Sequence, residues 1–116
     1  MKNARRALMA GFTTVRDVGT YRAVLDVALR DYINDGYVMG PRMAVAGAYI
    51  TVSSGGGEVT GLATDVGIPA DMRFGVANSA DEVRQRVREI LNRGADLIKV
   101  IATGAVLTAG TKPGVQ

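Results

Sequence analysis

Apolar residues along this chain follow two alternating patterns, one with helical spacing and one typical of buried strands. Helical features occur in three stretches, about 3–10, 21–35 and 80–93. Short runs rich in apolar and β-branched residues occur in three others, about 12–17, 43–51 and 97–102. The pattern therefore predicts helices that alternate with strands.

The predicted helices have recognisable ends. A glycine follows each of them, at Gly11, Gly36 and Gly94, where this residue commonly lies beyond a helix C-terminus. The third helix begins with a capping box formed by Ser79 and Glu82. Apolar residues of the second and third helices each fall on one face. They are Tyr21, Leu25, Ala28, Leu29 and Tyr32 in the second helix, and Val83, Val87, Ile90 and Leu91 in the third.

The predicted strands are nearly continuous apolar runs, which is typical of parallel strands joined by helices and covered on both faces. Repeats of this α/β unit form either a doubly wound sheet or a (β/α)8 barrel. Three strands cannot close a barrel, which takes about 250 residues, and they would leave both sheet edges bare. We therefore expect residues 1–116 to be a single segment of a larger α/β protein, with a long Gly-rich loop at about 53–78.

Composition excludes several kinds of site. The 116 residues include no cysteine and no histidine, so the chain by itself has no disulfide, His-based zinc site or Ser-His-Asp triad. Net charge is only +3 and aromatic residues make up 5%, so we expect no nucleic-acid partner. No apolar run approaches the ~20 residues of a membrane span, and no secretory signal is evident. We expect a cytoplasmic protein without a membrane partner.

Lys99 is the most prominent candidate for chemistry, because it interrupts the apolar run LIKVIA. Strand alternation places Lys99 with Leu97 and Ile101 on one face, opposite Ile98 and Val100. A lysine that points inward near the C-terminal end of a barrel strand lies where barrel active sites form. Such an amine could form a Schiff base, act as a general base, or bridge metals after carboxylation. The structural alternative is an amine that reaches solvent from the strand end.

Two further regions could contribute to a site. Asp17 shares a face with Val15, so it could position a substrate or orient a metal ligand; an ion pair with Arg16 or an Asx turn would be the structural alternatives. The segment SSGGGEVTG, residues 53–61, matches neither a dinucleotide-binding motif nor a P-loop. We expect it to be a mobile loop over a site, with Glu58 as a polar contact, or else a flexible surface loop.

Four motifs, in this order, resemble the metal-dependent amidohydrolase superfamily: AGFTTVRDVG, GPRMAVAG, SADEVRQRVREILNRGAD and LIKVIATGAVLT. The likeness covers nearly all of the chain and is closest to the branch with imidazolonepropionase-like and Xaa-Pro dipeptidase-like enzymes. It implies that the chain forms strands 2 to 4 of a distorted (β/α)8 barrel. It also implies hydrolysis of C–N bonds in small amides, cyclic amides or dipeptides, with one or two divalent metals such as zinc.

The same resemblance assigns roles to particular residues. Lys99 matches the fourth-strand lysine that two-metal relatives carry as a carbamate between the ions, where a metal-activated water attacks the carbonyl. Arg16, Asp17, Glu58 and Thr103 are candidates for the rim around the substrate. The histidine ligands of the family have no counterpart in this sequence, nor does the histidine that many relatives carry in the Gly-rich loop. We therefore expect an internal fragment that holds no catalytic metal and is inactive alone.

Two other functions remain open from the residues. The chain could be a non-catalytic α/β module that self-associates through exposed strand edges. It could also be a phosphate- or nucleotide-binding α/β domain that uses the Gly-rich loop.

Overall fold

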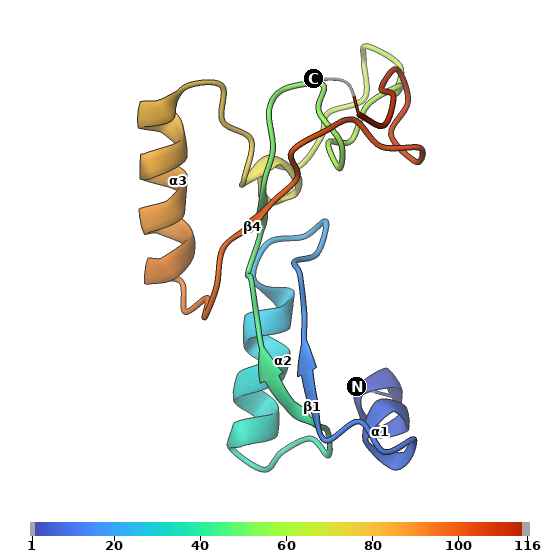
Figure 1. Cartoon of the computed structure of the whole chain (residues 1–116), viewed down its shortest axis with the longest axis vertical. Helices are drawn as coiled ribbons and strands as arrows, with labels where there is room; N and C mark the ends of the chain where they lie inside the picture. The colour runs from blue at the N-terminus through green and yellow to red at the C-terminus, as the bar shows by residue number, and fades with distance from the viewer. Residues whose placement is uncertain (1, 115–116) are drawn as a thin grey trace.

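The structure is a computed structural model and describes residues 2–114. Its helices are α1 (Lys2–Met9), α2 (Leu25–Asn34) and α3 (Ala80–Asn92), with one 3-10 helix at Ala70–Arg73. Its strands are β1 (Thr14–Arg16), β2 (Arg42–Ala44), β3 (Tyr49–Ile50) and β4 (Lys99–Val100). Helix α2 lies against β2, and α3 lies beside β3 near the other end of the molecule (Figure 1).

The strands pair in parallel, as predicted, but the predicted count of three is wrong. β1 pairs with β2, and β3 pairs with β4, where Tyr49 lies opposite Lys99. The predicted strand 43–51 is interrupted between β2 and β3, where Gly47 has a φ of 69°. The structure therefore contains four short strands in two two-stranded sheets.

Hydrogen bonds from α2 and the turn before it explain the interruption. The Gly47 N–H donates to the buried carboxylate of Asp26 at 2.8 Å, and the Gly47 carbonyl accepts from the Val24 N–H at 2.7 Å. These partners replace the pairing that Gly47 would otherwise make within a sheet. The same contact shortens the predicted helix 21–35, because Val24 takes a left-handed conformation and α2 begins only at Leu25.

The helix ends agree well with the sequence. All three glycines that follow the predicted helices have a positive φ, the conformation that favours glycine there. In the capping box the Glu82 N–H donates to the Ser79 hydroxyl at 3.2 Å, as predicted. The Glu82 carboxylate accepts from the Asn78 N–H rather than from the Ser79 N–H, at 2.7 Å. The reciprocal bond is thus displaced by one residue.

A small apolar cluster forms the core between α3 and β3. Its buried members are Ala23, Ala48, Ile50 and Ile90. From α3, Val83 and Val87 pack against this cluster, as the predicted stripe requires. Leu91 belongs to the same predicted stripe but is 46% exposed, so the buried face of α3 is narrower than the pattern indicates.

The apolar face of the second helix does not become its buried face. Tyr21, Leu25 and Tyr32 are each about half exposed, whereas Asp26 and Val27 are buried. Helix α2 turns Asp26 toward the strands because that carboxylate satisfies a buried backbone N–H at Gly47. A polar requirement of the strands therefore outweighs the apolar pattern of the helix.

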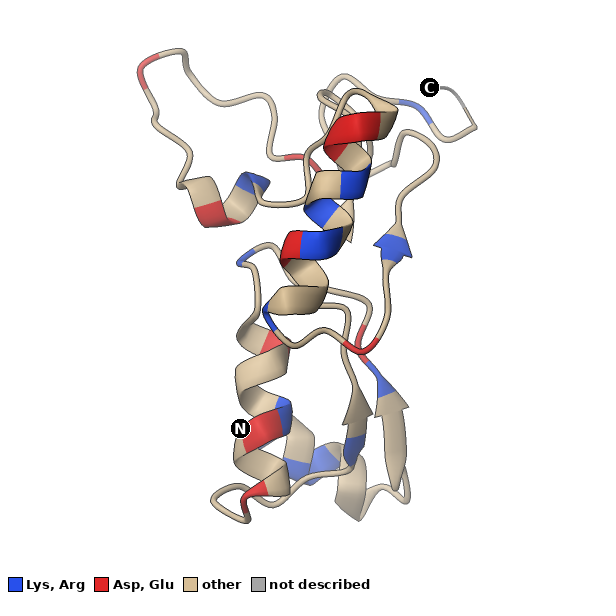
Figure 2. Cartoon of the chain, turned by 90° about the vertical axis from the view of Figure 1, so that its left-hand side faces the viewer, with Lys and Arg blue, Asp and Glu red and all other residues tan. Residues whose placement is uncertain are grey.

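The long loop is irregular over most of its length, in agreement with the sequence, apart from the 3-10 helix. Thr51 forms an isolated bridge with Val76, so the loop returns to the strand from which it leaves. Helix α3, which follows it, carries charges of both signs along its length (Figure 2). These include the ion pairs Arg84–Asp81 at 2.5 Å and Arg86–Glu89 at 2.6 Å.

Within residues 2–114, none of the helices has the length and apolar character that crossing a membrane would require.

Candidate functional site

A cavity of about 310 Å³ lies at the C-terminal ends of the strands and brings together three separate parts of the sequence. Residues 18–21 follow β1, Tyr49 belongs to β3, and Lys99 and Ile101 come from β4 and the residue after it. Ligands bind preferentially at this end of parallel α/β strands. Gly57, Ala105, Leu107 and Thr108 complete the lining.

Lys99 faces this cavity, as strand alternation predicts. Lys99 and Ile101 both line it, whereas Ile98, the residue before Lys99, packs against the apolar core on the other face. Lys99 is partly buried and is the one ionisable cation among the lining residues. Among residues 2–114 its amine makes no hydrogen bond or ion pair, so no carboxylate of these residues balances its charge.

Two tyrosines form the aromatic wall beside Lys99. The rings of Tyr21 and Tyr49 meet edge to face, with centroids 6.3 Å apart and an interplanar angle of 81°, an arrangement that aromatic pairs favour. The Tyr49 hydroxyl donates to the Gly57 carbonyl at 2.6 Å. Burial, and then the neighbouring Tyr21, raise the pKa of Tyr49. Tyr49 therefore stays protonated near neutral pH and presents its ring to the cavity.

The Gly-rich loop packs closely on the end of β4. Gly56 is buried, and a Cβ there would lie 2.5 Å from the Thr103 carbonyl oxygen. A Cβ at Gly57, where φ is +85°, would lie 2.5 Å from the Ile101 Cδ1 atom. These glycines permit a close approach between two segments that larger residues would hold apart.

Several backbone N–H groups of this loop are already bonded inside the protein. Gly57 donates to the Thr108 hydroxyl at 2.9 Å and Gly55 to the Val52 carbonyl at 2.9 Å, while Ser54 donates to the Glu58 carboxylate. A phosphate-binding loop needs such donors directed at its ligand. The loop geometry therefore gives no support to phosphate or nucleotide binding.

Glu58 is buried but does not line the Lys99 cavity. Its carboxylate pairs with the Arg73 guanidinium at 2.5 Å and accepts from the Ser54 N–H. Glu58 does line a second cavity of about 260 Å³, which shares Tyr21, Leu107 and Thr108 with the first. Glu58 thus fastens the Gly-rich loop to the 3-10 helix, next to the predicted site rather than in it.

The remaining predicted rim residues lie around the cavity but do not line it. Asp17 accepts a hydrogen bond from the Gly19 N–H at 3.0 Å, which is the Asx turn given above as a structural alternative. This turn leads the chain into the cavity wall at residues 18–21. Arg16 and Thr103 are exposed, and the Thr103 hydroxyl donates to the Gly104 carbonyl at 3.0 Å.

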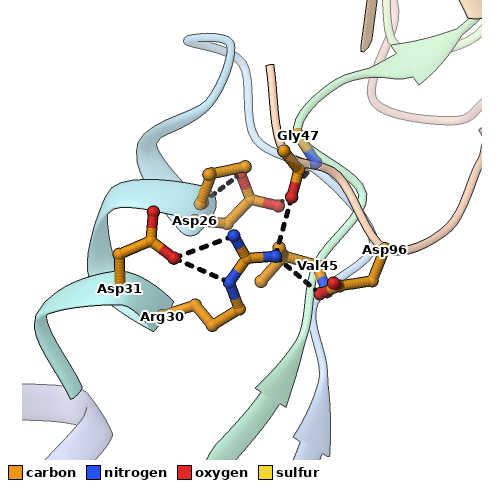
Figure 3. A network of polar contacts seen from close by, with 8 residues as sticks. Asp26, Arg30, Asp31, Val45, Gly47 and Asp96 are labelled. Atoms are coloured by element: carbon orange, nitrogen blue, oxygen red, sulfur yellow. Dashed lines mark hydrogen bonds and ion pairs between the residues drawn. The ribbon is translucent and has the colours of Figure 1, made fainter. Parts of the chain in front are cut away.

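A second polar cluster, which the sequence analysis did not single out, lies where β2 ends (Figure 3). Arg30 of α2 pairs with Asp96 at 2.8 Å and with Asp31 at 2.8 Å, and it donates to the Gly94 carbonyl at 2.7 Å. Asp96 also accepts from the Val45 N–H at 3.0 Å. This charged cluster, completed by Asp26, joins α2, the strand interruption and the turn that leads to Lys99.

The charges of this cluster stabilise one another. The Arg30 hydrogen bond, followed by the bond from the Val45 N–H, lowers the pKa of Asp96. Burial alone would lower the pKa of Arg30, but its hydrogen bonds with Asp96 and Asp31 outweigh that effect and raise it. The one signal in the sequence was Asp26 between the apolar residues Leu25 and Val27 of the predicted helix. Its partner Gly47 is too distant along the chain to be paired with it from spacing.

The described residues do not form a metal centre among themselves. No group of three or more histidine, cysteine, aspartate or glutamate side chains within residues 2–114 is placed to hold an ion. Lys99 has no carboxylate among its lining neighbours. Lys99 could supply one ligand after carboxylation, and no other side chain that lines the cavity within residues 2–114 is a histidine, cysteine or carboxylate.

Known proteins resemble this chain in both sequence and structure. The ochratoxinase of Aspergillus niger is 32% identical over 119 residues, covering 92% of this chain and 24% of that protein. A solved Xaa-Pro dipeptidase with bound methionine is 38% identical, with a TM-score of 0.82 over 92% of this chain and 26% of that one. A prolidase complexed with N-methylphosphonate-L-proline is 28% identical, with a TM-score of 0.80 over 97% and 28%.

The chain therefore spans about a quarter of the length of these relatives. The amidohydrolase family model matches residues 1–116, the whole of the sequence. The resemblance inferred from four short motifs is thus confirmed, including its likeness to Xaa-Pro dipeptidases. The match shows that this chain, with its parallel strands, belongs to the amidohydrolase family.

Proposed function

We propose that this chain forms one wall of the active site of an enzyme that hydrolyses amide C–N bonds in small amides or dipeptides. The observation that carries the proposal is the position of Lys99, partly buried in an apolar cavity at the C-terminal ends of parallel strands. The similar proteins support the reaction class, since they include a dipeptidase, a prolidase and an ochratoxinase. Residues 1–116 would contribute strands 2 to 4 of a (β/α)8 barrel.

Within this proposal Lys99 acts as a carbamate and holds a divalent metal such as zinc. A bound metal of this kind would supply a nucleophilic water at neutral pH and polarise the substrate carbonyl. These 116 residues include no histidine or cysteine, so the other ligands would have to come from outside this sequence. The chain by itself is then expected to hold no catalytic metal and to be inactive.

The residues of this chain would orient the substrate and exclude water. The Asp17–Gly19 turn directs residues 18–21 into the cavity wall, and the Tyr49–Gly57 hydrogen bond holds the Tyr49 ring against Tyr21 in the same wall. Apolar walls around Lys99 lower the local dielectric, which strengthens electrostatic interactions there. Arg16, Glu58 and Thr103 are the remaining candidates for the rim, since they lie on or beside the segments that form it.

A chimaera tests the proposal. Residues 2–114 would replace the matched quarter of the Xaa-Pro dipeptidase, whose structure superposes with a TM-score of 0.82. We expect the chimaera to bind metal and hydrolyse an Xaa-Pro dipeptide, and the Lys99→Ala chimaera to lose at least about 100-fold in activity together with metal content. Lys112→Ala removes an exposed lysine outside the Lys99 cavity and is the matched control.

Elemental analysis separates the possible results. A folded chimaera whose metal content and turnover do not depend on Lys99 would contradict the proposed role. Stoichiometric zinc together with turnover in the 116-residue chain alone would contradict the expectation that the chain is inactive by itself.

A further inference from the structure

The segment that leads into β4 is hydrogen-bonded to both backbone polar groups of Val45. The Val45 N–H donates to the Asp96 carboxylate at 3.0 Å. The Val45 carbonyl accepts from the Asp96 N–H at 2.8 Å and from the Leu97 N–H at 3.3 Å. Val45 is fully buried, so water cannot replace this carboxylate as the acceptor for its N–H. Asp96 therefore satisfies a buried donor at the point where β2 ends.

The backbone bonds on the two sides of the strand interruption share one register. Before the interruption, the Asp96 N–H donates to the Val45 carbonyl. After it, the Ile101 N–H donates to the Ile50 carbonyl at 2.9 Å. Both bonds join residues that are the same number of positions apart in the chain. The register set at Asp96 is therefore the register of the β3–β4 pair.

Arg30 of α2 holds the Asp96 carboxylate in place. Its guanidinium pairs with Asp96 at 2.8 Å and donates to the Gly94 carbonyl at 2.7 Å, so two points of the turn before β4 are tied to the helix (Figure 3). Hydrogen bonds between charged groups are stronger than those between neutral ones. The beginning of β4 is thus fixed to α2 as well as to Val45.

We propose that Asp96 is a positioning residue whose bonds to Val45 fix the register in which Lys99 faces the cavity. β3 and β4 have only two residues each, and a slip of one residue would turn Lys99 to the opposite face. In the observed register Tyr49 lies opposite Lys99. The role of Lys99 rests here on the proposed function, whereas the register rests on the hydrogen bonds alone.

Amide hydrogen exchange in the 116-residue chain, followed by NMR, tests whether Asp96 holds this register. The Ile101 N–H reports on the β3–β4 pair, and the Arg42 N–H, which donates to the Thr13 carbonyl at 3.0 Å, reports on the β1–β2 pair. We expect Asp96→Ala to raise the exchange rate of Ile101 at least about tenfold more than that of Arg42, because losing a buried hydrogen bond opens the strand pair locally. A residue that served only overall stability would raise both rates equally, because both amides would then exchange through global unfolding.

Two further replacements separate the hydrogen bond of Asp96 from its charge. Asp96→Asn keeps an amide oxygen that can accept from the Val45 N–H, so the Ile101 rate should stay within about threefold of the native value. Asp96→Glu keeps the charge but moves the carboxylate by one methylene group. It should raise the Ile101 rate selectively, and it provides the measurement where Asp96→Ala does not fold.

Asp31→Ala is the matched control. Asp31 also pairs with Arg30 at 2.8 Å, and its side chain is 54% exposed, against 44% for Asp96. Within residues 2–114 the Asp31 carboxylate bonds only to Arg30. This variant should therefore leave the ratio of the two exchange rates unchanged.

The chimaera with the Xaa-Pro dipeptidase gives the functional readout. Per folded molecule, Asp96→Ala should lower kcat at least about tenfold and leave KM within about twofold, because a displaced Lys99 affects the reacting atoms more than substrate binding. Asp96→Asn should recover most of that loss, and Asp31→Ala should show none.

Three results would overturn the inference: equal rises at Ile101 and Arg42, no recovery by Asp96→Asn, or a change of the same size in Asp31→Ala. An active chimaera that depends on Lys99 but is unaffected by Asp96→Ala also refutes it and leaves the proposed function intact. A selective rise at Ile101 together with an inactive, folded chimaera refutes only the proposed function.

Discussion

The two charged regions of this molecule differ in how completely their charges are satisfied. In the cluster of Asp26, Arg30 and Asp96, each ionised group has at least two partners within the protein (Figure 3). In the cavity at the strand ends, Lys99 lies among apolar side chains and has no such partner among residues 2–114.

This difference determines how much each set of charges contributes to the stability of the fold. A paired charge that also satisfies backbone groups holds elements together, and removing one partner leaves the others unsatisfied. An unpaired cation in an apolar wall contributes nothing comparable to folding, and its desolvation is a cost. The charged cluster therefore contributes to the fold through its pairing, whereas the fold gains no comparable contact from the amine of Lys99 within residues 2–114.

Removing the buried carboxylate of Asp26 should have the largest effect on stability. Asp26 is 3% exposed and accepts from the Gly47 N–H at 2.8 Å and the Val27 N–H at 3.0 Å. Asp26→Ala leaves both donors unsatisfied, so we expect a loss of about 3 kcal/mol in the free energy of unfolding. Urea denaturation followed by circular dichroism measures it.

Asp65→Ala is the control for that experiment, because Asp65 lies exposed in the long loop. It should change the free energy of unfolding by less than about 0.5 kcal/mol. Equal losses in the two variants would show that Asp26 is not the residue that fixes the strand interruption.

The Arg30–Asp96 pair should make stability depend weakly on pH. The pKa of Asp96 is lowered in the folded protein, so its contribution is complete above the unfolded value of about 3.9 and is lost as pH falls through the folded value. Because the Asp96 side chain is 44% exposed, solvent screening keeps this contribution below about 1 kcal/mol. The difference in urea midpoint between the native chain and Asp96→Asn should therefore narrow from pH 6 to pH 3.

Asp65→Asn serves as the reference in this series, and its difference from the native chain should stay constant across the same range. A difference for Asp96→Asn that widens toward pH 3 would mean that the folded pKa of Asp96 is not lowered.

Replacing Lys99 should have the smallest effect on stability. Lys99→Met keeps the length of the side chain and removes an amine that has no partner among residues 2–114. We expect a change within about 0.5 kcal/mol in the free energy of unfolding, or a slight stabilisation. Arg30→Met is the matched change in the charged cluster and should cost about 2 kcal/mol. A loss above about 1.5 kcal/mol for Lys99→Met would instead make Lys99 a structural residue.

Local features of the fold could be predicted because they depend on neighbouring residues. The glycines after the three helices, the cap at Ser79 and the alternation that separates Lys99 from Ile98 are set by backbone geometry over a few residues. The candidate site could likewise be predicted only in part. Lys99 was placed in the cavity, whereas Tyr21 and Tyr49, which form its aromatic wall, were not identified.

The features that the sequence failed to predict depend on residues far apart in the chain. Asp26 meets Gly47 and Arg30 meets Asp96, so the interrupted strand and the buried face of α2 follow from contacts that local spacing does not encode. Apolar periodicity assigned the wrong face of α2 for this reason.

The sequence by itself determined the family, the alternation of helices and parallel strands, and the side of the strand to which Lys99 belongs, because these follow from short motifs and backbone periodicity. Only the tertiary structure decided which carboxylates serve the fold and which side chains surround the lysine. Buried backbone donors must find acceptors wherever the chain brings them, and that requirement placed Asp26 inside the molecule and left Leu25 and Tyr32 of α2 about half exposed.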